Sequence, residues 1–169
     1  MLPPIGEGGH IFSSSEIRRL VREGMVARVV PLLGRHFSLG GRVVHGHHRG
    51  KELGFPTANV LSDHELIPAD GVYAVKVKSG ALLLDGACNI GKKPTFGGEE
   101  RSIEVFLFDF QGDLYDRELR IFFIERLRGE SAYPDPEVLK DAISADVLRC
   151  REILGATTLF DEILDREGK

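Results

Sequence analysis

The spacing of apolar residues near the N-terminus is that of a helix. Apolar side chains recur every three or four residues from residue 17, and Ser13 and Glu16 form a capping-box pattern ahead of them. Gly24 is placed to end this helix. A second short helical turn is expected over residues 26–33, so the pattern predicts a short helical segment in this part of the chain.

Beyond residue 39 the pattern changes to alternating apolar and polar positions, which is typical of half-buried strands. Tight hairpin turns are predicted at residues 79–80 and 111–113. No helical pattern interrupts this stretch, and parallel strands would need crossover connections that it lacks, which favours a closed antiparallel barrel. The predicted strands are 43–44, 72–78, 81–90, 102–110 and 119–127.

A helical pattern returns towards the C-terminus. Asp135 can cap a helix that has Pro136 at its first position, where proline is well tolerated. Residues 158–166 are a candidate for a further turn or helix. The helix after Asp135 has one apolar stripe, expected to pack on the barrel, made of Leu139, Ile143, Val147, Cys150 and Leu154.

The composition is that of an ordinary globular protein, with 42% hydrophobic and 28% charged residues among 169. This length allows one buried core with a small appendage and is too short for two full catalytic domains. A net charge of −4 argues against nucleic-acid binding, and no apolar stretch has the length of a transmembrane helix or the form of a signal sequence. Cys88 and Cys150 lack the spacing of a disulfide or zinc site and are interpreted as buried thiols. A cytoplasmic protein that binds neither nucleic acid nor membranes is expected.

The segment from Gly46 to Asn59 has the residues of a nucleotide-phosphate site. Its glycines let backbone N–H groups approach an anion closely, and Arg49 and Lys51 add positive charge. Thr57 and Asn59 project to the same side of an extended piece, and their hydroxyl and amide oxygens suit a Mg2+ shared with phosphates. A simple turn between two strands is the competing interpretation of the loop alone.

Three neighbouring histidines, His45, His47 and His48, suggest a transition-metal site as an alternative. No carboxylate or cysteine has a spacing that would complete such a site. Solvated histidines beside a glycine-rich loop are therefore the favoured interpretation of this cluster.

Several motifs along residues 39–154 resemble those of the riboflavin kinase family and occur in the family's order. The glycine-rich segment leads into Pro-Thr-Ala-Asn at residues 56–59. The other motifs that carry the resemblance are DGVYAV at 70–75, NIGKKPTFG at 89–97, SIEVFLFDF at 102–110, GDLY at 112–115 and RLRGE at 126–130.

The resemblance implies a mainly β fold: a closed antiparallel Greek-key barrel of about six strands, with a C-terminal helix packed on it and a short N-terminal helical segment. Residues 13–18 and 33–35 are also similar to the end of the adenylyltransferase half of the bifunctional bacterial enzyme that makes FMN and then FAD. We therefore expect residues 1–37 to be a helical remnant of such a domain and residues 38–169 to be a riboflavin kinase domain. The adenylyltransferase's catalytic histidine motif is absent, so no FAD synthesis is expected. An adenylyltransferase domain is an expected partner if the chain is a fragment.

The implied reaction transfers the γ-phosphoryl group of ATP, used with Mg2+, to the 5′-hydroxyl of riboflavin and gives FMN and ADP. On the predicted strand, Glu104 shares one face with Phe106 and Phe108. A carboxylate removed from water is a better proton acceptor, although a solvated edge glutamate fits the pattern equally well. The glutamate at this motif position is the family's catalytic base, and the resemblance carries that role to Glu104.

The resemblance also assigns the other binding roles. A non-catalytic flavin- or nucleotide-binding barrel is the alternative, and the presence of the base and metal ligands argues against it. The expected ligands are Thr57 and Asn59 for Mg2+; Gly46, Arg49, Gly50, Lys51, Gly54, Phe55, Pro56 and Thr57 for ATP; and Arg128, Glu130 and Tyr133 for the flavin.

Overall fold

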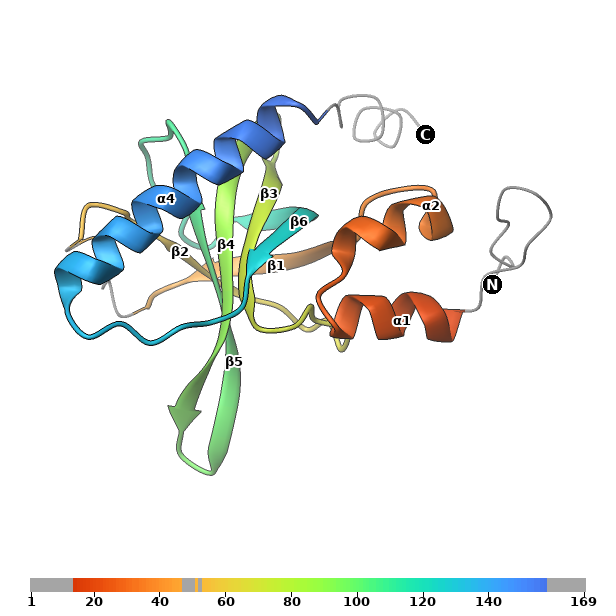
Figure 1. The fold of residues 1–169 in the computed structure, drawn as a ribbon, viewed down its shortest axis with the longest axis horizontal. Coiled ribbons are helices and arrows are strands. Elements are labelled where there is room, and N and C mark those ends of the chain that lie inside the picture. Colours follow the sequence, from red (N-terminus) through yellow and green to blue (C-terminus); the bar gives the residue numbers. More distant parts are fainter. Residues whose placement is uncertain (1–13, 47–50, 52, 158–169) are drawn as a thin grey trace.

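The computed structural model describes residues 14–46, 51 and 53–157. Their strands close into an antiparallel barrel in the order β1-β2-β5-β4-β3-β6 (Figure 1), which confirms the predicted mainly β architecture. Short helical elements precede the barrel, and a long helix follows it. The elements are α1 (Ser14–Arg22), the 3₁₀ helix η2 (Val26–Val29), α2 (Val30–Leu33), β1 (Ser38–Val44), β2 (Ala58–Leu61), β3 (Gly71–Ser79), β4 (Leu82–Thr95), β5 (Gly98–Leu107), β6 (Glu118–Arg128) and α4 (Pro136–Gly155).

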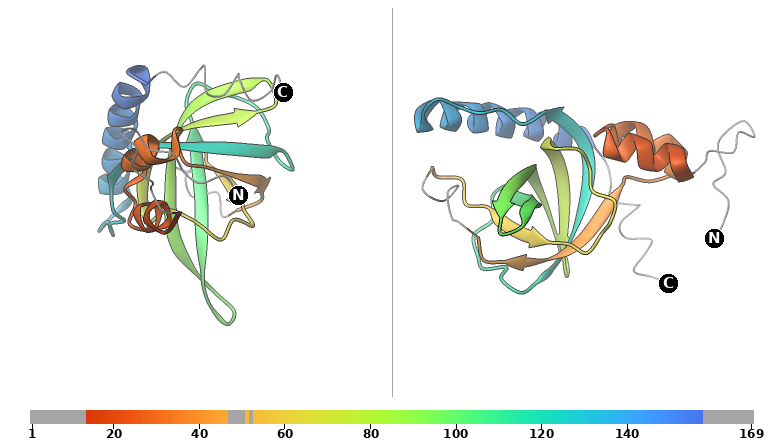
Figure 2. Two further views of the ribbon diagram at one scale, coloured as in Figure 1. Left: turned by 90° about the vertical axis from the view of Figure 1, so that its right-hand side faces the viewer. Right: turned by 90° about the horizontal axis from the view of Figure 1, so that it is seen from below.

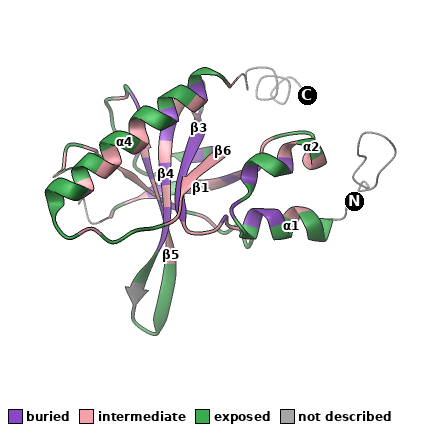
Figure 3. Cartoon of the chain, in the orientation of Figure 1, coloured by how far each residue is buried: buried purple, intermediate pink, exposed green. Residues whose placement is uncertain are grey.

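Buried residues lie along the strands of the barrel (Figure 3). Their apolar side chains, from alternate strand positions, make up the core of the barrel. Tyr73 and Phe123 are fully buried and meet edge to face, with ring centroids 5.3 Å apart. Residues from α1 and η2, including Leu20 and Val26, join the same core cluster. The helical segment and the barrel therefore share one core in the described residues.

The predicted end of the first helix is confirmed. α1 ends at Arg22, and Gly24 follows with a φ of 80°, in the left-handed region that glycine adopts without steric cost. Its N–H donates to the carbonyl of Val21 at 2.9 Å. The proposed capping residue Ser13 lies outside the described residues.

One predicted hairpin is confirmed and another is wrong. Ser79 and Leu82 pair across a tight turn between β3 and β4, as expected. Residues 111–113 do not join neighbouring strands, because β5 pairs with β2 and β4 whereas β6 pairs with β1 and β3. The connection instead crosses the end of the barrel, held by the buried side chain of Leu114 and by backbone hydrogen bonds to Val43. A glycine in a polar segment marks a change of direction but does not say which strands it connects.

The β4–β5 hairpin is longer than predicted and projects from the barrel (Figure 1). The ladder continues through Lys92↔Arg101 and Lys93↔Glu100, and Phe96 is fully exposed near its tip. The alternating pattern failed to predict this extension because both faces of the protruding strands are in water, so no apolar face is required.

Helix α4 lies along one side of the barrel (Figure 2) and covers a second apolar cluster that includes Phe108, Phe122, Cys150 and Leu154. Its start is as predicted: the Asp135 carboxylate accepts a hydrogen bond from the N–H of Val138 at 2.9 Å. Both cysteines of the chain are free and buried, which confirms their interpretation as thiols of the core. The predicted further helix at 158–166 lies outside the described residues.

Close burial of the predicted stripe is confined to the C-terminal half of α4. Leu139 and Ile143 are only half-buried. At the other end, the Arg151 guanidinium donates to the Asp109 carboxylate at 2.9 Å and lies 4.7 Å from the ring centroid of Phe108. The helix therefore packs most closely on the barrel at its C-terminal end, and its first turns are less buried.

Candidate functional site

The strand register brings together side chains that are far apart in the sequence. Asn59 of β2 is the direct partner of Glu104 of β5, and Glu104 is the direct partner of Asn89 of β4. Opposed residues in antiparallel strands point to the same face, with Cβ atoms about 5 Å apart. We call these three residues the polar row. The flanking Ile103 and Val105 are buried in the barrel interior, so the polar row lies on the outer face.

The polar row is half-buried, and no side-chain hydrogen bond joins its members to one another or to other described residues. Amide and carboxylate groups in such a setting retain their donors and acceptors for a ligand. The structure thus brings the predicted metal ligand Asn59 next to the predicted base Glu104.

Aromatic rings border the polar row on one side. Phe106 lies two positions beyond Glu104 on the same face, and its ring centroid is 5.5 Å from that of Phe108, as the alternation predicted. Phe55, from the segment predicted to bind ATP, meets Phe106 edge to face at 5.4 Å. This contact attaches the segment before β2 to the strand that carries the predicted base.

Gly46 lies directly against the side chain of Asn59. A Cβ added at Gly46 would overlap the Asn59 amide, so glycine is needed at this position for the close approach of the backbone. Lys51 and Gly54 are exposed in the same region. Arg49 and Gly50, predicted for ATP binding, and His47 and His48 of the alternative metal site lie outside the described residues.

A cavity of about 330 Å³ opens beside this segment, a size at the lower end of small-molecule sites. Pro56 and Thr57 line it together with Lys51, Val105 and Tyr115. Tyr115 also stacks on His45, with ring centroids 3.9 Å apart. Part of the predicted nucleotide segment, including Thr57, therefore borders a hollow on the side of β5 that carries the inward-facing Val105.

The predicted flavin residue Arg128 is engaged within the protein. Its Nε and Nη2 groups donate to the Asp146 carboxylate of α4, at 3.1 and 2.7 Å, and this hydrogen bonding raises the pKa of the guanidinium above its ordinary value. Its Cζ also lies 5.6 Å from the ring centroid of Tyr133, another predicted flavin residue. Arg128 thus connects β6, α4 and the segment between them.

The third predicted flavin residue, Glu130, covers Gly91 of β4. A side chain at Gly91 would overlap the Glu130 carboxylate. Burial raises the pKa of Glu130, and the negative charges of Asp70 and Glu104 raise it further. Glu130 therefore lies within electrostatic reach of the polar row.

The same row of strand partners continues to Arg128. Val72 of β3 is the partner of Asn89 on one side and of Arg128 on the other. The predicted metal ligand, base and flavin residues thus follow one line across the outer face of the barrel. The sequence analysis predicted roles for Asn59, Glu104 and Arg128 on this line. It gave no role to Asn89, which lies in the NIGKKPTFG motif, or to Asp146.

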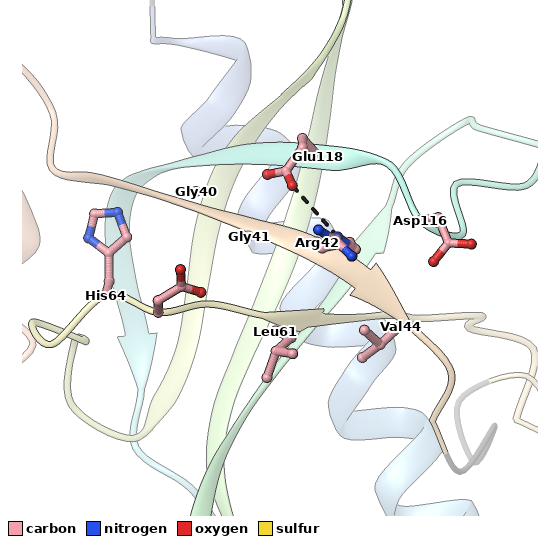
Figure 4. Close-up of a pocket in the computed structure, with 9 residues that line it drawn as sticks. Gly40, Gly41, Arg42, Val44, Leu61, His64, Asp116 and Glu118 are labelled. Carbon is pink, nitrogen blue, oxygen red and sulfur yellow. Dashed lines mark ion pairs between the residues drawn. The ribbon is translucent and has the colours of Figure 1, made fainter.

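A larger hollow, of about 720 Å³, lies on the outer face of β1 and β2 (Figure 4). Its wall is made by the bare backbone of Gly40 and Gly41 and by charged side chains, among them Arg42, which lies 3.7 Å from the carboxylate of Glu118. Among the described residues, none predicted to bind ATP, metal or flavin lines it. Its size alone therefore does not make it the candidate site.

Comparison with known proteins shows which family this chain belongs to. The family model for flavokinase (riboflavin kinase) matches residues 33–154. The bifunctional riboflavin kinase/FMN adenylyltransferase of Escherichia coli K12 is 40% identical over 152 residues, which cover 89% of this chain and 49% of that protein. Its counterpart in Bacillus subtilis is 39% identical over 150 residues, covering 86% of this chain and 48% of that protein. The chain spans about half the length of these curated relatives.

Two solved structures share the fold. The crystal structure described as a macrolide-efflux protein from Streptococcus pneumoniae superposes with a TM-score of 0.81 and 34% identity, over 89% of this chain and 50% of that one. Riboflavin kinase from Trypanosoma brucei superposes with a TM-score of 0.52 and 25% identity, over 70% of this chain and 77% of that one. Within the described residues, no helix has the length and apolarity needed to cross a membrane. The family match over most of the chain establishes that this protein belongs to the riboflavin kinase family, with its flavokinase domain at residues 33–154.

Proposed function

We propose that this chain is a riboflavin kinase, which transfers the γ-phosphoryl group of ATP to the 5′-hydroxyl of riboflavin and releases FMN and ADP. The observation that carries the proposal is the polar row, in which the candidate base Glu104 faces the candidate metal ligand Asn59 across one strand pair, within a flavokinase domain. Phosphoryl transfer needs such positioning, because its catalysis depends on alignment and on neutralising charge.

Glu104 acts as the general base in this proposal. A primary hydroxyl is a weak nucleophile until a positioned group accepts its proton. Glu104 is half-buried on the outer face beside Phe106, so its carboxylate is oriented by the strand and partly shielded from water. The proton of the 5′-hydroxyl passes to Glu104 as the oxygen attacks the γ-phosphorus atom.

Thr57 and Asn59 hold Mg2+. A hydroxyl and an amide oxygen leave most of the coordination sphere to water and phosphate oxygens, which suits Mg2+ better than a closed cage of carboxylates. The contact of Gly46 with the Asn59 amide supports this fit, because it fixes the amide while adding no side chain above it. When bound, the ion neutralises charge on the transferred phosphoryl group.

The segment before β2 binds the ATP phosphates. Lys51 and Gly54 are exposed, and Phe55 is held against Phe106, so the segment is anchored close to the polar row. Exposed backbone N–H groups and cations are the usual means of holding phosphate. The ATP-binding residues of the proposal are Gly46, Arg49, Gly50, Lys51, Gly54, Phe55, Pro56 and Thr57.

The flavin ring binds at the far end of the row, with Arg128, Glu130 and Tyr133. Tyr133 is half-buried with the Arg128 guanidinium near its ring, so its plane is held in place for stacking on an isoalloxazine ring. The carboxylate of Glu130 lies over Gly91, between this end and the polar row.

We further propose that residues 1–37 correspond to the end of an adenylyltransferase domain and residues 38–169 to the kinase domain, in a cytoplasmic protein. The curated relatives are bifunctional and about twice as long, and the matched model is that of the flavokinase domain alone. We therefore propose no FAD synthesis by this chain. Its partners are ATP and riboflavin, together with an adenylyltransferase domain if the chain is part of a longer protein.

The test is to incubate the protein with ATP, Mg2+ and riboflavin and to separate FMN from riboflavin by chromatography. Glu104→Gln should lower turnover by about 10²- to 10⁴-fold while ATP binding persists, because only the proton acceptor is lost. Glu100→Gln, on the exposed part of the same strand, is the matched control and should retain full turnover. A folded wild-type protein that binds riboflavin without making FMN would instead favour a non-catalytic flavin-binding barrel.

A further inference from the structure

Asn89 occupies the one position of the polar row that has no assigned role. It is the direct strand partner of Glu104 on one side and of Val72 on the other, and Val72 is in turn the partner of Arg128. With strands about 4.8 Å apart, Asn89 lies roughly 5 Å from the base and roughly 10 Å from the residue at the flavin end. In the proposed function, the ribityl chain joins the flavin ring near Arg128 to the reacting hydroxyl near Glu104 and therefore passes this position.

The surroundings of Asn89 leave its amide accessible. Its neighbours on the same face of β4 are Ala87, which packs with the cluster under α4, and Gly91, which has no side chain. Asn89 is half-buried and makes no side-chain hydrogen bond with the described residues. A half-buried amide at the centre of a sheet, without an internal partner, retains both its donor and its acceptor capacity.

The chemistry of the adjacent groups explains why an amide suits this position. Glu104 and Glu130 are carboxylates, which when ionised only accept hydrogen bonds. The secondary hydroxyls of a ribityl chain need acceptors for their protons and donors for their oxygens. The side chain of Asn89 supplies one of each next to the base.

We propose that Asn89 is a substrate-positioning residue that hydrogen-bonds the ribityl hydroxyls beside Glu104 and so selects a polyhydroxylated chain on the flavin. This inference rests on the proposed riboflavin kinase function. It extends that function by assigning to β4 the recognition of the polyol, separately from phosphate binding at β2 and flavin binding near α4.

The test compares riboflavin with a flavin analogue whose side chain has the same length but only the terminal hydroxyl. The wild-type protein should prefer riboflavin in kcat/KM, and Asn89→Ala should reduce that preference by about threefold to tenfold, the effect of one lost hydrogen bond. Asn89→Ser, which keeps a shorter polar group, should retain an intermediate preference. The KM for ATP should be unchanged in both variants.

The exposed amide of Gln111 provides the control, since Gln111→Ala should leave the preference intact. A purely structural role for Asn89 would lower kcat/KM for both flavins by the same factor, and that result would overturn the inference, as would a wild-type protein that shows no preference. A wild-type protein that makes no FMN at all would overturn the proposed function and this inference with it. If Asn89→Ala fails to fold, Asn89→Ser tests the proposal by itself. A preference for riboflavin equal to that of the wild type in Asn89→Ser would contradict a hydrogen bond from Asn89 to the ribityl hydroxyls.

Discussion

The ion pair between Arg128 and Asp146 should contribute measurably to stability and should fix the flavin end of the site. The guanidinium and the carboxylate meet through two nitrogen atoms, and the side chains are only 29% and 13% exposed. The pair joins the end of β6 to the middle of α4, where the helix stripe is incompletely buried. Removing one partner leaves the other charge partly buried without its counter-ion.

The magnitude follows from this intermediate burial. Exposed ion pairs contribute up to about 1 kcal/mol, whereas breaking a buried pair costs about 3–5 kcal/mol. The two side chains are shielded from water over roughly three-quarters of their surface. We therefore expect either Arg128→Ala or Asp146→Ala to lower the free energy of unfolding by about 2 kcal/mol, which corresponds to about 5 °C in Tm for a chain of this size. The double variant should lose little more than either single variant.

The assay is equilibrium unfolding in urea for the wild type, the two single variants and the double variant, with the coupling energy taken from the cycle. A coupling free energy below about 0.5 kcal/mol would refute the reasoning, because it would place the pair among exposed ones. Riboflavin KM is a second readout. We expect Asp146→Ala to raise it several-fold although Asp146 is not a proposed ligand, because Arg128 would no longer be held beside Tyr133.

Two further predictions concern close packing. Gly46→Ala should raise the KM for ATP with Mg2+ and leave the KM for riboflavin unchanged, because the new Cβ displaces the Asn59 amide. Gly155→Ala is the control, since a Cβ there meets no atom within 4 Å. Equal kinetics in both variants would contradict the need for glycine beside Asn59. Burial raises the pKa of Cys88, and it raises that of Cys150 to about 12. Both thiols should therefore resist an aromatic disulfide reagent at pH 8 in the folded protein and react at once in urea. Rapid labelling of the native protein would count against this burial.

The sequence predicted those parts of the fold in which one face is buried. Alternation indicated β3, β6 and most of β5, because their inward residues fill the barrel. It failed for the hairpin around Phe96, where both faces are solvated, and for the turn at 111–113, where glycine marks a bend but not its destination. Local patterns report the burial of a residue's own side chain and carry little information about which strand is its neighbour.

In the candidate site, too, local patterns predicted which face a residue occupies but not which strand lies beside it. Glu104 could be placed on a face with aromatic rings, because that inference uses only the periodicity of its own strand. That Thr57 and Asn59 act from one side of their segment stays a prediction. The pairing of Asn59 with Glu104, the insertion of Asn89 beside them and the link from Arg128 to Asp146 depend on strand order and helix docking. No spacing in the sequence encodes those contacts.

The register that assembles the polar row is fixed by the core. Side chains alternate along a strand, so a slip of β5 by one residue would turn Glu104 into the barrel and place Val105 on the outer face. The burial of Ile103, Val105 and Leu107 opposes such a slip, since each would be moved into water at a cost of about 1.5–3 kcal/mol. The apolar residues that close the barrel therefore also set the distance between the proposed base and the proposed metal ligand. Substitutions inside the barrel that loosen the pairing of β5 should accordingly impair phosphoryl transfer without touching either group.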